Sequence, residues 1–144
     1  MSLPTLSTLV EGLNAQQRKA IEAKDGPTLV IAGPGSGKTR VLISRVAYLI
    51  AVRDVFAFRI MAVTFTNKAS REMRERLNRL VGVDKTNDLM LGTFHSICAR
   101  VLRRAAATGE LAGVDRNFTI YDSDDQNNVV KAALAEMNLD DKKF

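Results

Sequence analysis

A lysine and a threonine follow a run of glycines near the start of the chain, and these residue types at this spacing could hold phosphate. The stretch Thr28 to Thr39 reads TLVIAGPGSGKT. Leu29 to Ile31 is typical of a buried parallel strand, and Lys38 opens a segment with helical spacing, so the glycines fall where a strand turns into a helix. The strict form of this pattern has glycine where this chain has Ala32. The stretch nevertheless predicts a phosphate-binding loop.

Each part of the predicted loop is suited by its chemistry to binding phosphate or the metal ion that accompanies it. Gly33, Gly35 and Gly37 allow backbone angles and close approaches that a Cβ would obstruct, so successive N–H groups can point at phosphate oxygens. The start of the helix adds partial positive charge. Lys38 is expected to reach the β- and γ-phosphates, and the hydroxyl of Thr39 is expected to ligate Mg²⁺. The alternative is an ordinary glycine-rich turn with a solvated lysine.

Composition and charge narrow the function classes. The 144 residues suit one domain or a piece of one, and the net charge is +5. Residues 1–109 carry 17 basic and 8 acidic side chains, whereas residues 110–144 carry 4 and 8. The basic part could face nucleic acid, or its charges could be solvated helix faces. The single cysteine excludes a disulfide framework, and with no signal peptide or long apolar span we expect a cytoplasmic protein with no membrane partner.

Strands alternate with helices in the pattern of apolar residues. Asn14 with Gln17 is typical of a capping box, which predicts a helix to about Ala23. Further helices are expected at residues 38–52, 68–80 and 95–106, and strands at residues 29–31, 60–65 and 89–91. The alternation predicts right-handed crossovers and a parallel sheet.

The expected helices also predict which side chains are buried and where each helix begins. Asn67 is expected to cap the helix at 68–80, with Met73, Leu77 and Leu80 on its inner side, and the helix at 95–106 is expected to bury Ile97, Val101 and Leu102. Residues 118–121 are expected to be extended. Ser123 with Gln126 predicts a second capping box, before a helix with apolar residues Val129, Val130, Ala133, Leu134 and Met137.

Some candidate metal-binding residues have simpler interpretations. Asp84 and Asp122 each follow an apolar stretch and could be a metal-binding acid, but Asp84 fits a turn and Asp122 fits a helix start better. His95 and Cys98 are three residues apart, yet they are the only histidine and the only cysteine, so a zinc site would lack ligands. A polar contact at a helix start is expected for His95, and a small buried thiol for Cys98.

Four segments in register resemble a known family. LNAQQ at 13–17, AGPGSGKTR at 32–40, TFTNKAS at 64–70 and GTFHS at 92–96 resemble the opening motifs of superfamily 1 DNA helicases of the UvrD/Rep/PcrA family. YDSDDQ at 121–126 resembles the lead-in to that family's inserted helical subdomain. The resemblance covers about residues 13–144. It implies an α/β, RecA-like P-loop NTPase fold, a partial parallel sheet flanked by helices. Residues 13–106 would be a partial first ATP-binding domain, residues 107–144 the start of the inserted subdomain, and residues 1–12 a tail or an expression-vector remnant outside the fold.

The resemblance assigns nucleotide-binding roles by position. Gln17 resembles the glutamine that hydrogen-bonds the adenine edge, although the capping box explains it as well. Arg40 resembles the arginine that packs on the adenine ring; alternatively it is an exposed side chain in the first helical turn. The cofactors implied are ATP and Mg²⁺, with Lys38 and Thr39 as the catalytic residues. The implied ATP-binding loop comprises Ala32, Gly33, Pro34, Gly35, Ser36, Gly37, Lys38, Thr39 and Arg40.

Two other segments resemble contacts to single-stranded DNA. The first comprises Phe65, Thr66, Asn67 and Lys68, and the second comprises Thr93, Phe94 and His95. An aromatic side chain at the end of a strand can stack on a base of any identity, and Lys68 with nearby Arg71 would neutralise phosphates. The alternative for both segments is a strand end followed by a helix cap.

The resemblance implies an ATP-dependent helicase that moves 3′ to 5′ on single-stranded DNA or at duplex junctions, in repair or replication. The family's acidic DExx motif and its second RecA-like domain are not in the sequence. We therefore expect an amino-terminal fragment that partners the rest of a helicase chain. Alone, it should bind nucleotide weakly at best, without hydrolysing ATP or unwinding DNA. Two rival interpretations are a small P-loop kinase and a non-catalytic nucleic-acid-binding module with a relic loop.

Overall fold

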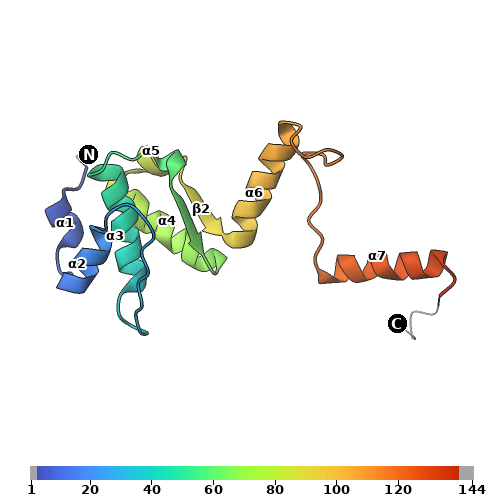
Figure 1. Ribbon diagram of the computed structural model, residues 1–144, viewed down its shortest axis with the longest axis horizontal. Helices are drawn as coiled ribbons and strands as arrows, with labels where there is room; N and C mark the ends of the chain where they lie inside the picture. Colours follow the sequence, from blue (N-terminus) through green and yellow to red (C-terminus); the bar gives the residue numbers. More distant parts are fainter. Residues whose placement is uncertain (1–2, 140–144) are drawn as a thin grey trace. The chain divides into compact units, whose positions relative to one another are not determined.

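The structure, a computed structural model, describes residues 3–139. Residues up to Arg100 form one compact unit and residues from Val101 onward form a second. The described helices and strands, shown in Figure 1, are α1 (Leu6–Val10), α2 (Ala15–Ile21), α3 (Lys38–Ala51), the 3₁₀ turn η1 (Ala57–Arg59), β1 (Met61–Thr64), α4 (Asn67–Val81), α5 (Val83–Thr86), β2 (Met90–Thr93), α6 (Phe94–Ala107) and α7 (Ser123–Glu136). None of the helices in the described part is both long and apolar enough to cross a membrane.

Strands β1 and β2 pair in parallel, with Met61 opposite Met90 and Thr64 opposite Thr93. Parallel neighbours require a crossover connection, and α4 supplies it. The predicted α/β organisation with a parallel sheet is therefore confirmed, and the strands expected at 60–65 and 89–91 lie within one or two residues of those observed.

The strand expected at residues 29–31 is not formed. Leu29 and Ile31 are 86% and 89% exposed, and within the described residues the sheet consists of β1 and β2 alone. A buried parallel strand exists only where neighbouring strands take up its backbone hydrogen bonds on both sides. The apolar run therefore has the composition of a strand without the pairing that would make it one.

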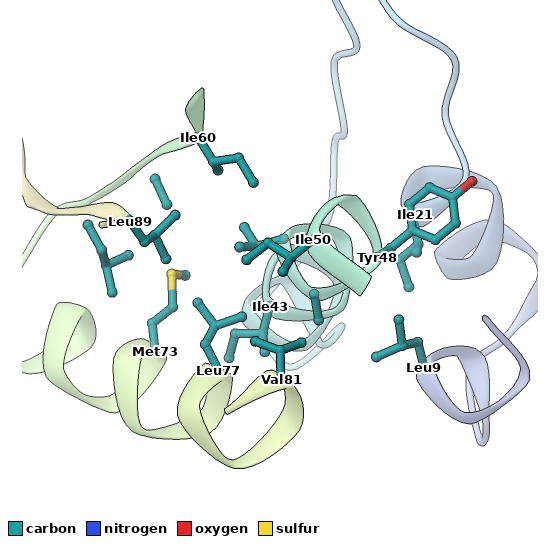
Figure 2. Close-up of a cluster of buried hydrophobic side chains, with 14 of the residues drawn as sticks. Leu9, Ile21, Ile43, Tyr48, Ile50, Ile60, Met73, Leu77, Val81 and Leu89 are labelled. Carbon is teal, nitrogen blue, oxygen red and sulfur yellow. The ribbon is translucent and has the colours of Figure 1, made fainter. Parts of the chain in front are cut away.

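The core lies where α3 packs against α1 and α2 on one side and against α4 and the sheet on the other. Figure 2 shows Ile43 and Ile50 of α3 between Leu9 and Ile21 on one side and Leu77 on the other. The expectation that residues 1–12 lie outside the fold is wrong for α1, because its Leu9 and Val10 are buried in this core. Lack of periodicity in so short a stretch hid a five-residue helix whose Leu9 and Val10 are buried by tertiary contacts.

Helix starts follow capping chemistry, with two corrections. The predicted capping box of Asn14 and Gln17 is present at α2. Thr66 rather than Asn67 caps α4, because its side chain accepts a hydrogen bond from the N–H of Ala69. Asp122 with Asp125, rather than Ser123 with Gln126, forms the box at α7. In both corrections two adjacent residues can cap a helix, and the preceding one does so.

Several side chains expected to be buried are exposed. Met73, Leu77 and Ile97 are buried as predicted, whereas Leu80 of α4 and Val101 and Leu102 of α6 are 38%, 46% and 44% exposed. No residue of α7 is buried. An apolar helix face is buried only where another element packs on it, and helical spacing alone does not show which part of the face is covered.

Arginine side chains tie α3 and the segment just after it to α2 and the turn that follows α2. Arg45 donates to the carbonyl of Ile21 at 2.5 Å, and Arg53 forms an ion pair with Asp25 at 3.2 Å. The hydrogen bond with the Tyr48 side chain, together with the charge of Asp25, raises the pKa of Arg53 above its ordinary value. Arg53 is charged in the folded and unfolded chain at any physiological pH, so this shift gives no pH dependence of stability.

Candidate functional site

The glycine-rich loop leads directly into α3. Gly37 has left-handed backbone angles, φ 79° and ψ 22°, and occupies the position before Lys38 at the start of the helix. Gly35 is also left-handed, with φ 71°. Between them, the hydroxyl and the backbone N–H of Ser36 both donate to the carbonyl of Gly33, at 2.6 and 3.4 Å, which closes a tight turn over Pro34. Of the three glycines predicted to need this freedom, Gly35 and Gly37 use it, whereas Gly33 is not left-handed and a Cβ there would meet no atom within 4 Å.

Lys38 folds back over this loop. Its Nζ donates to the carbonyl of Gly33 at 2.6 Å and to that of Ala32 at 3.2 Å. Thr39 is the next residue, exposed in the first turn of α3. The ammonium group and the hydroxyl therefore both lie at the end of the helix where backbone N–H groups lack partners within the helix, an arrangement that suits an anion.

Five of the predicted nucleotide-binding residues line two separate pockets, and the other five, Gly33, Pro34, Gly35, Gly37 and Thr39, line neither. Gln17, Ala32, Ser36 and Lys38 belong to a pocket of about 620 Å³ between α2, residues 26–32 and the first half of α3, which we call the loop pocket. The loop pocket therefore brings the predicted phosphate-binding lysine together with the predicted base-recognition glutamine.

Arg40 lines a different pocket of about 470 Å³, together with Glu11 of the segment after α1 and with Arg76 and Arg79 of α4. Its guanidinium donates to the carbonyl of Glu11 at 2.8 Å and to that of Gly12 at 3.5 Å. Arg40 is thus exposed in the first turn of α3, as the alternative interpretation holds, and its side chain is also fixed by these two bonds. Sequence reasoning missed this pocket, because Arg40 is more than 30 residues from Arg76 and Arg79 along the chain.

The second group of predicted residues gathers at the carboxyl ends of the two strands. Thr64 and Thr93 are opposite each other, so Phe65 and Phe94 each follow directly after the paired ends of neighbouring strands. Phe65 is fully exposed and Phe94 is 68% exposed. Asn67, Lys68 and His95 are exposed in the first turns of α4 and α6. The parallel pairing therefore places the two predicted segments side by side.

The backbone beneath these aromatic rings is well anchored. The hydroxyl of Thr64 hydrogen-bonds the hydroxyl of Ser70 and donates to the carbonyl of Thr66 at 3.1 Å. Thr93 Oγ1 accepts from the N–H of Ser96 at 3.3 Å, as a helix cap does. Arg100 donates to the carbonyl of Leu91 at 3.1 Å. Each of the two segments thus contains a strand end, a helix cap and an exposed aromatic ring. The interpretation as a strand end with a helix cap is therefore compatible with the interpretation as a contact to DNA.

Replacing Gly92 with alanine is expected to destabilise this edge. A Cβ at Gly92 would lie 2.4 Å from the Ser96 hydroxyl and 3.4 Å from Ile97 and Arg100. Overpacking of this kind costs about 1–3 kcal/mol, so Gly92→Ala should lower the urea midpoint of unfolding. At Gly33 a Cβ would meet no atom within 4 Å, so Gly33→Ala is the control and should change stability by less than about 1 kcal/mol. Equal midpoints for the two variants would contradict the close packing at Gly92.

The structure places the remaining candidate metal-binding residues within helices or at their starts. Asp84 lies in the first helical turn of the short helix α5, not in the loop turn expected for it. The Asp122 side chain accepts from the N–H groups of Asp124 and Asp125, so it caps the start of α7. Cys98 is exposed, so the predicted buried thiol is wrong. Among residues 3–139 there is no group of three or more histidine, cysteine, aspartate or glutamate side chains that could hold a metal ion.

Comparison with known proteins identifies the family of this chain. Residues 13–144 match the model of the UvrD/REP helicase N-terminal domain. The chain is 48% identical over 139 residues to ATP-dependent DNA helicase PcrA of Staphylococcus aureus, covering 96% of this chain and 18% of that protein. It is 50% identical over 136 residues to ATP-dependent DNA helicase PcrA of Bacillus subtilis, covering 94% of this chain and 18% of that protein. The chain thus spans less than a fifth of the length of these relatives. It belongs to the UvrD/REP helicase N-terminal domain family.

Proposed function

We propose that this chain is the amino-terminal ATP-binding part of an ATP-dependent DNA helicase that moves 3′ to 5′ along single-stranded DNA, in repair or replication. The observation that carries the proposal is the glycine-rich loop at the start of α3, with left-handed Gly35 and Gly37 and with Lys38 folded over it. The PcrA relatives are ATP-dependent DNA helicases. Because this chain belongs to the same family, we extend ATP use and action on DNA to it as a proposal.

In this proposal the loop pocket takes the triphosphate. Lys38 would exchange its bonds to the carbonyls of Ala32 and Gly33 for bonds to phosphate oxygens, which attract an ammonium group more strongly than carbonyls do. The first N–H groups of α3 would bind the same oxygens. Mg²⁺ needs several oxygen ligands, and the exposed hydroxyl of Thr39 can supply one of them beside phosphate oxygens and water. When bound there, the ion would neutralise charge on the phosphates.

The proposed fold is RecA-like, with residues 29–31 as a strand in a larger sheet of the intact protein. The high exposure of Leu29 and Ile31 fits a strand whose neighbours come from elsewhere in a longer protein. We retain residues 13–106 as the partial ATP-binding domain and residues 107–144 as the start of an inserted helical subdomain. A second RecA-like domain would close over ATP. For the 144-residue chain by itself we propose weak nucleotide binding without hydrolysis or unwinding.

Single-stranded DNA is proposed to cross the carboxyl edge of the sheet. Phe65 and Phe94 lie next to each other there and are exposed enough to stack on bases. Lys68 and Arg71 are exposed on α4 just beyond Phe65 and would bind backbone phosphates. None of these contacts depends on base identity, which suits a protein that must move along any sequence.

The proposed function is tested with the protein encoded by the complete reading frame. We expect ATP hydrolysis that rises when single-stranded DNA is added, and unwinding of duplexes that carry a 3′ single-stranded tail but not of those with a 5′ tail. The same protein with Lys38→Ala is the control and should do neither. Phosphoryl transfer to a nucleoside or metabolite would instead support a kinase. Salt-sensitive binding of DNA that is unaffected by nucleotide would support a non-catalytic module.

A further inference from the structure

We propose that Gln17 is a positioning residue of the phosphate loop, in addition to its predicted role in recognising the base. The inference rests on the proposed nucleotide site. It follows from the two polar atoms of one side chain, which connect helix α2 to the loop 19 residues further along the chain.

Both polar atoms of the Gln17 amide are engaged. Its Oε1 accepts from the N–H of Asn14 at 3.0 Å, which is its half of the capping box. Its Nε2 donates to the carbonyl of Ser36 at 3.0 Å. A Cβ on Gly37 would come within 3.1 Å of the same Nε2, so the amide lies against the loop backbone. The capping box accounts for the first bond but not for the second.

The bond to Ser36 orients a peptide group of the loop. The carbonyl of Ser36 and the N–H of Gly37 belong to one planar trans peptide unit, in which they point in opposite directions. This unit lies between Ser36 and Gly37, and Gly37 is left-handed and has no Cβ to restrict the unit on its side. By holding the carbonyl, Gln17 therefore also sets the direction of the Gly37 N–H, one of the groups proposed to bind phosphate.

The same amide can still recognise a base. A primary amide has two N–H donors and two acceptor positions, and the structure uses one of each. The remaining donor and acceptor match an edge that presents an acceptor beside an amino group, as adenine does. The Gln17 side chain can thus both recognise a base and set the loop geometry. Replacing Gln17 should therefore weaken the binding even of a ligand that has no base.

The test uses magnesium tripolyphosphate, which has phosphates but no base, and two variants. Gln17→Met keeps the length of the side chain and removes both of its hydrogen bonds. Asn14→Ala also weakens the start of α2, by removing the bond from the N–H of Gln17 to Asn14 at 2.9 Å, but it leaves the Gln17 side chain intact. We expect Gln17→Met to weaken tripolyphosphate binding about threefold to tenfold, and Asn14→Ala to leave it within about twofold. ATP binding should fall further in Gln17→Met, because the base contact is lost too.

Two outcomes would overturn the proposal. If Gln17→Met weakens ATP but not tripolyphosphate binding, Gln17 acts on the base alone. If both variants weaken tripolyphosphate equally, helix capping explains the effect.

A second measurement needs no ligand and so separates this proposal from the proposed function. Amide hydrogen exchange at Gly35 to Thr39 should be faster in Gln17→Met than in the unchanged chain and unaffected in Asn14→Ala. Equal exchange in both variants would refute the positioning role. Absence of any tripolyphosphate or ATP binding by the unchanged chain would refute the nucleotide site and leave the exchange result to decide the positioning role.

Discussion

Replacing Lys38 with alanine is expected to weaken Mg·ATP binding roughly 10- to 150-fold, because a hydrogen bond to a charged group contributes about 1.5–3 kcal/mol. Lys38 Nζ is held 2.6 Å from the carbonyl of Gly33, directly over the loop, so its charge is already where phosphate oxygens would lie. Calorimetric or fluorescence titration of the 144-residue chain, and of the full-length protein, measures the change.

The control separates binding from folding. Lys85 is an exposed lysine in the last turn of α5 and lines neither pocket, so Lys85→Ala should bind Mg·ATP as the unchanged chain does. Because Lys38 is exposed and bonds only two loop carbonyls, Lys38→Ala should change the free energy of unfolding by less than about 0.5 kcal/mol. Equal affinity in the two variants would mean that the loop does not bind phosphate through its lysine.

Removing both aromatic rings at the carboxyl edge of the sheet, with Phe65→Ala and Phe94→Ala together, should weaken binding of single-stranded DNA at least about 30-fold. Stacking on an aromatic ring contributes roughly 1–3 kcal/mol per base, and two rings are lost. Both rings are exposed, so the loss should appear in DNA affinity rather than in folding. Fluorescence anisotropy with a labelled homopolymer strand, at fixed salt, measures the effect.

The chain offers a matched pair of aromatic residues as a control. Phe56 and Phe58 are 63% and 62% exposed and stack on each other with ring centroids 5.4 Å apart, just before the amino end of β1. Their double alanine variant loses the same number of exposed aromatic rings at the opposite end of that strand. We expect it to leave DNA affinity unchanged. If both double variants lose affinity equally, exposed aromatic surface in general, and not the carboxyl edge, is responsible.

Local chemistry made much of this fold predictable. The apolar spacing after Lys38 predicted α3, and the short apolar runs around Ala62 and Leu91 predicted the two paired strands. The capping box at Asn14 was predictable as well, because it depends only on residues a few positions apart. The glycines of the loop indicate where unusual backbone angles are allowed, and Gly35 and Gly37 adopt such angles whereas Gly33 does not.

Features that depend on distant residues were not predictable. Leu29 to Ile31 has the composition of a strand, but its pairing depends on neighbours that local sequence does not specify. Arg40 donates to carbonyls 28 and 29 residues earlier in the chain, and Gln17 donates to a carbonyl 19 residues later. No pattern in the sequence predicts either contact. The choice between adjacent capping residues, such as Thr66 and Asn67, depends on backbone angles that differ by a single position.

The most direct test of the central claim is an NMR titration of the ¹⁵N-labelled 144-residue chain with Mg·ATP, which detects weak binding residue by residue. The account predicts saturable shifts of the backbone amides of residues 33–40 and of the Gln17 side-chain amide, and their loss in the Lys38→Ala chain. Saturable shifts confined to other parts of the chain, or none at millimolar Mg·ATP, would contradict it.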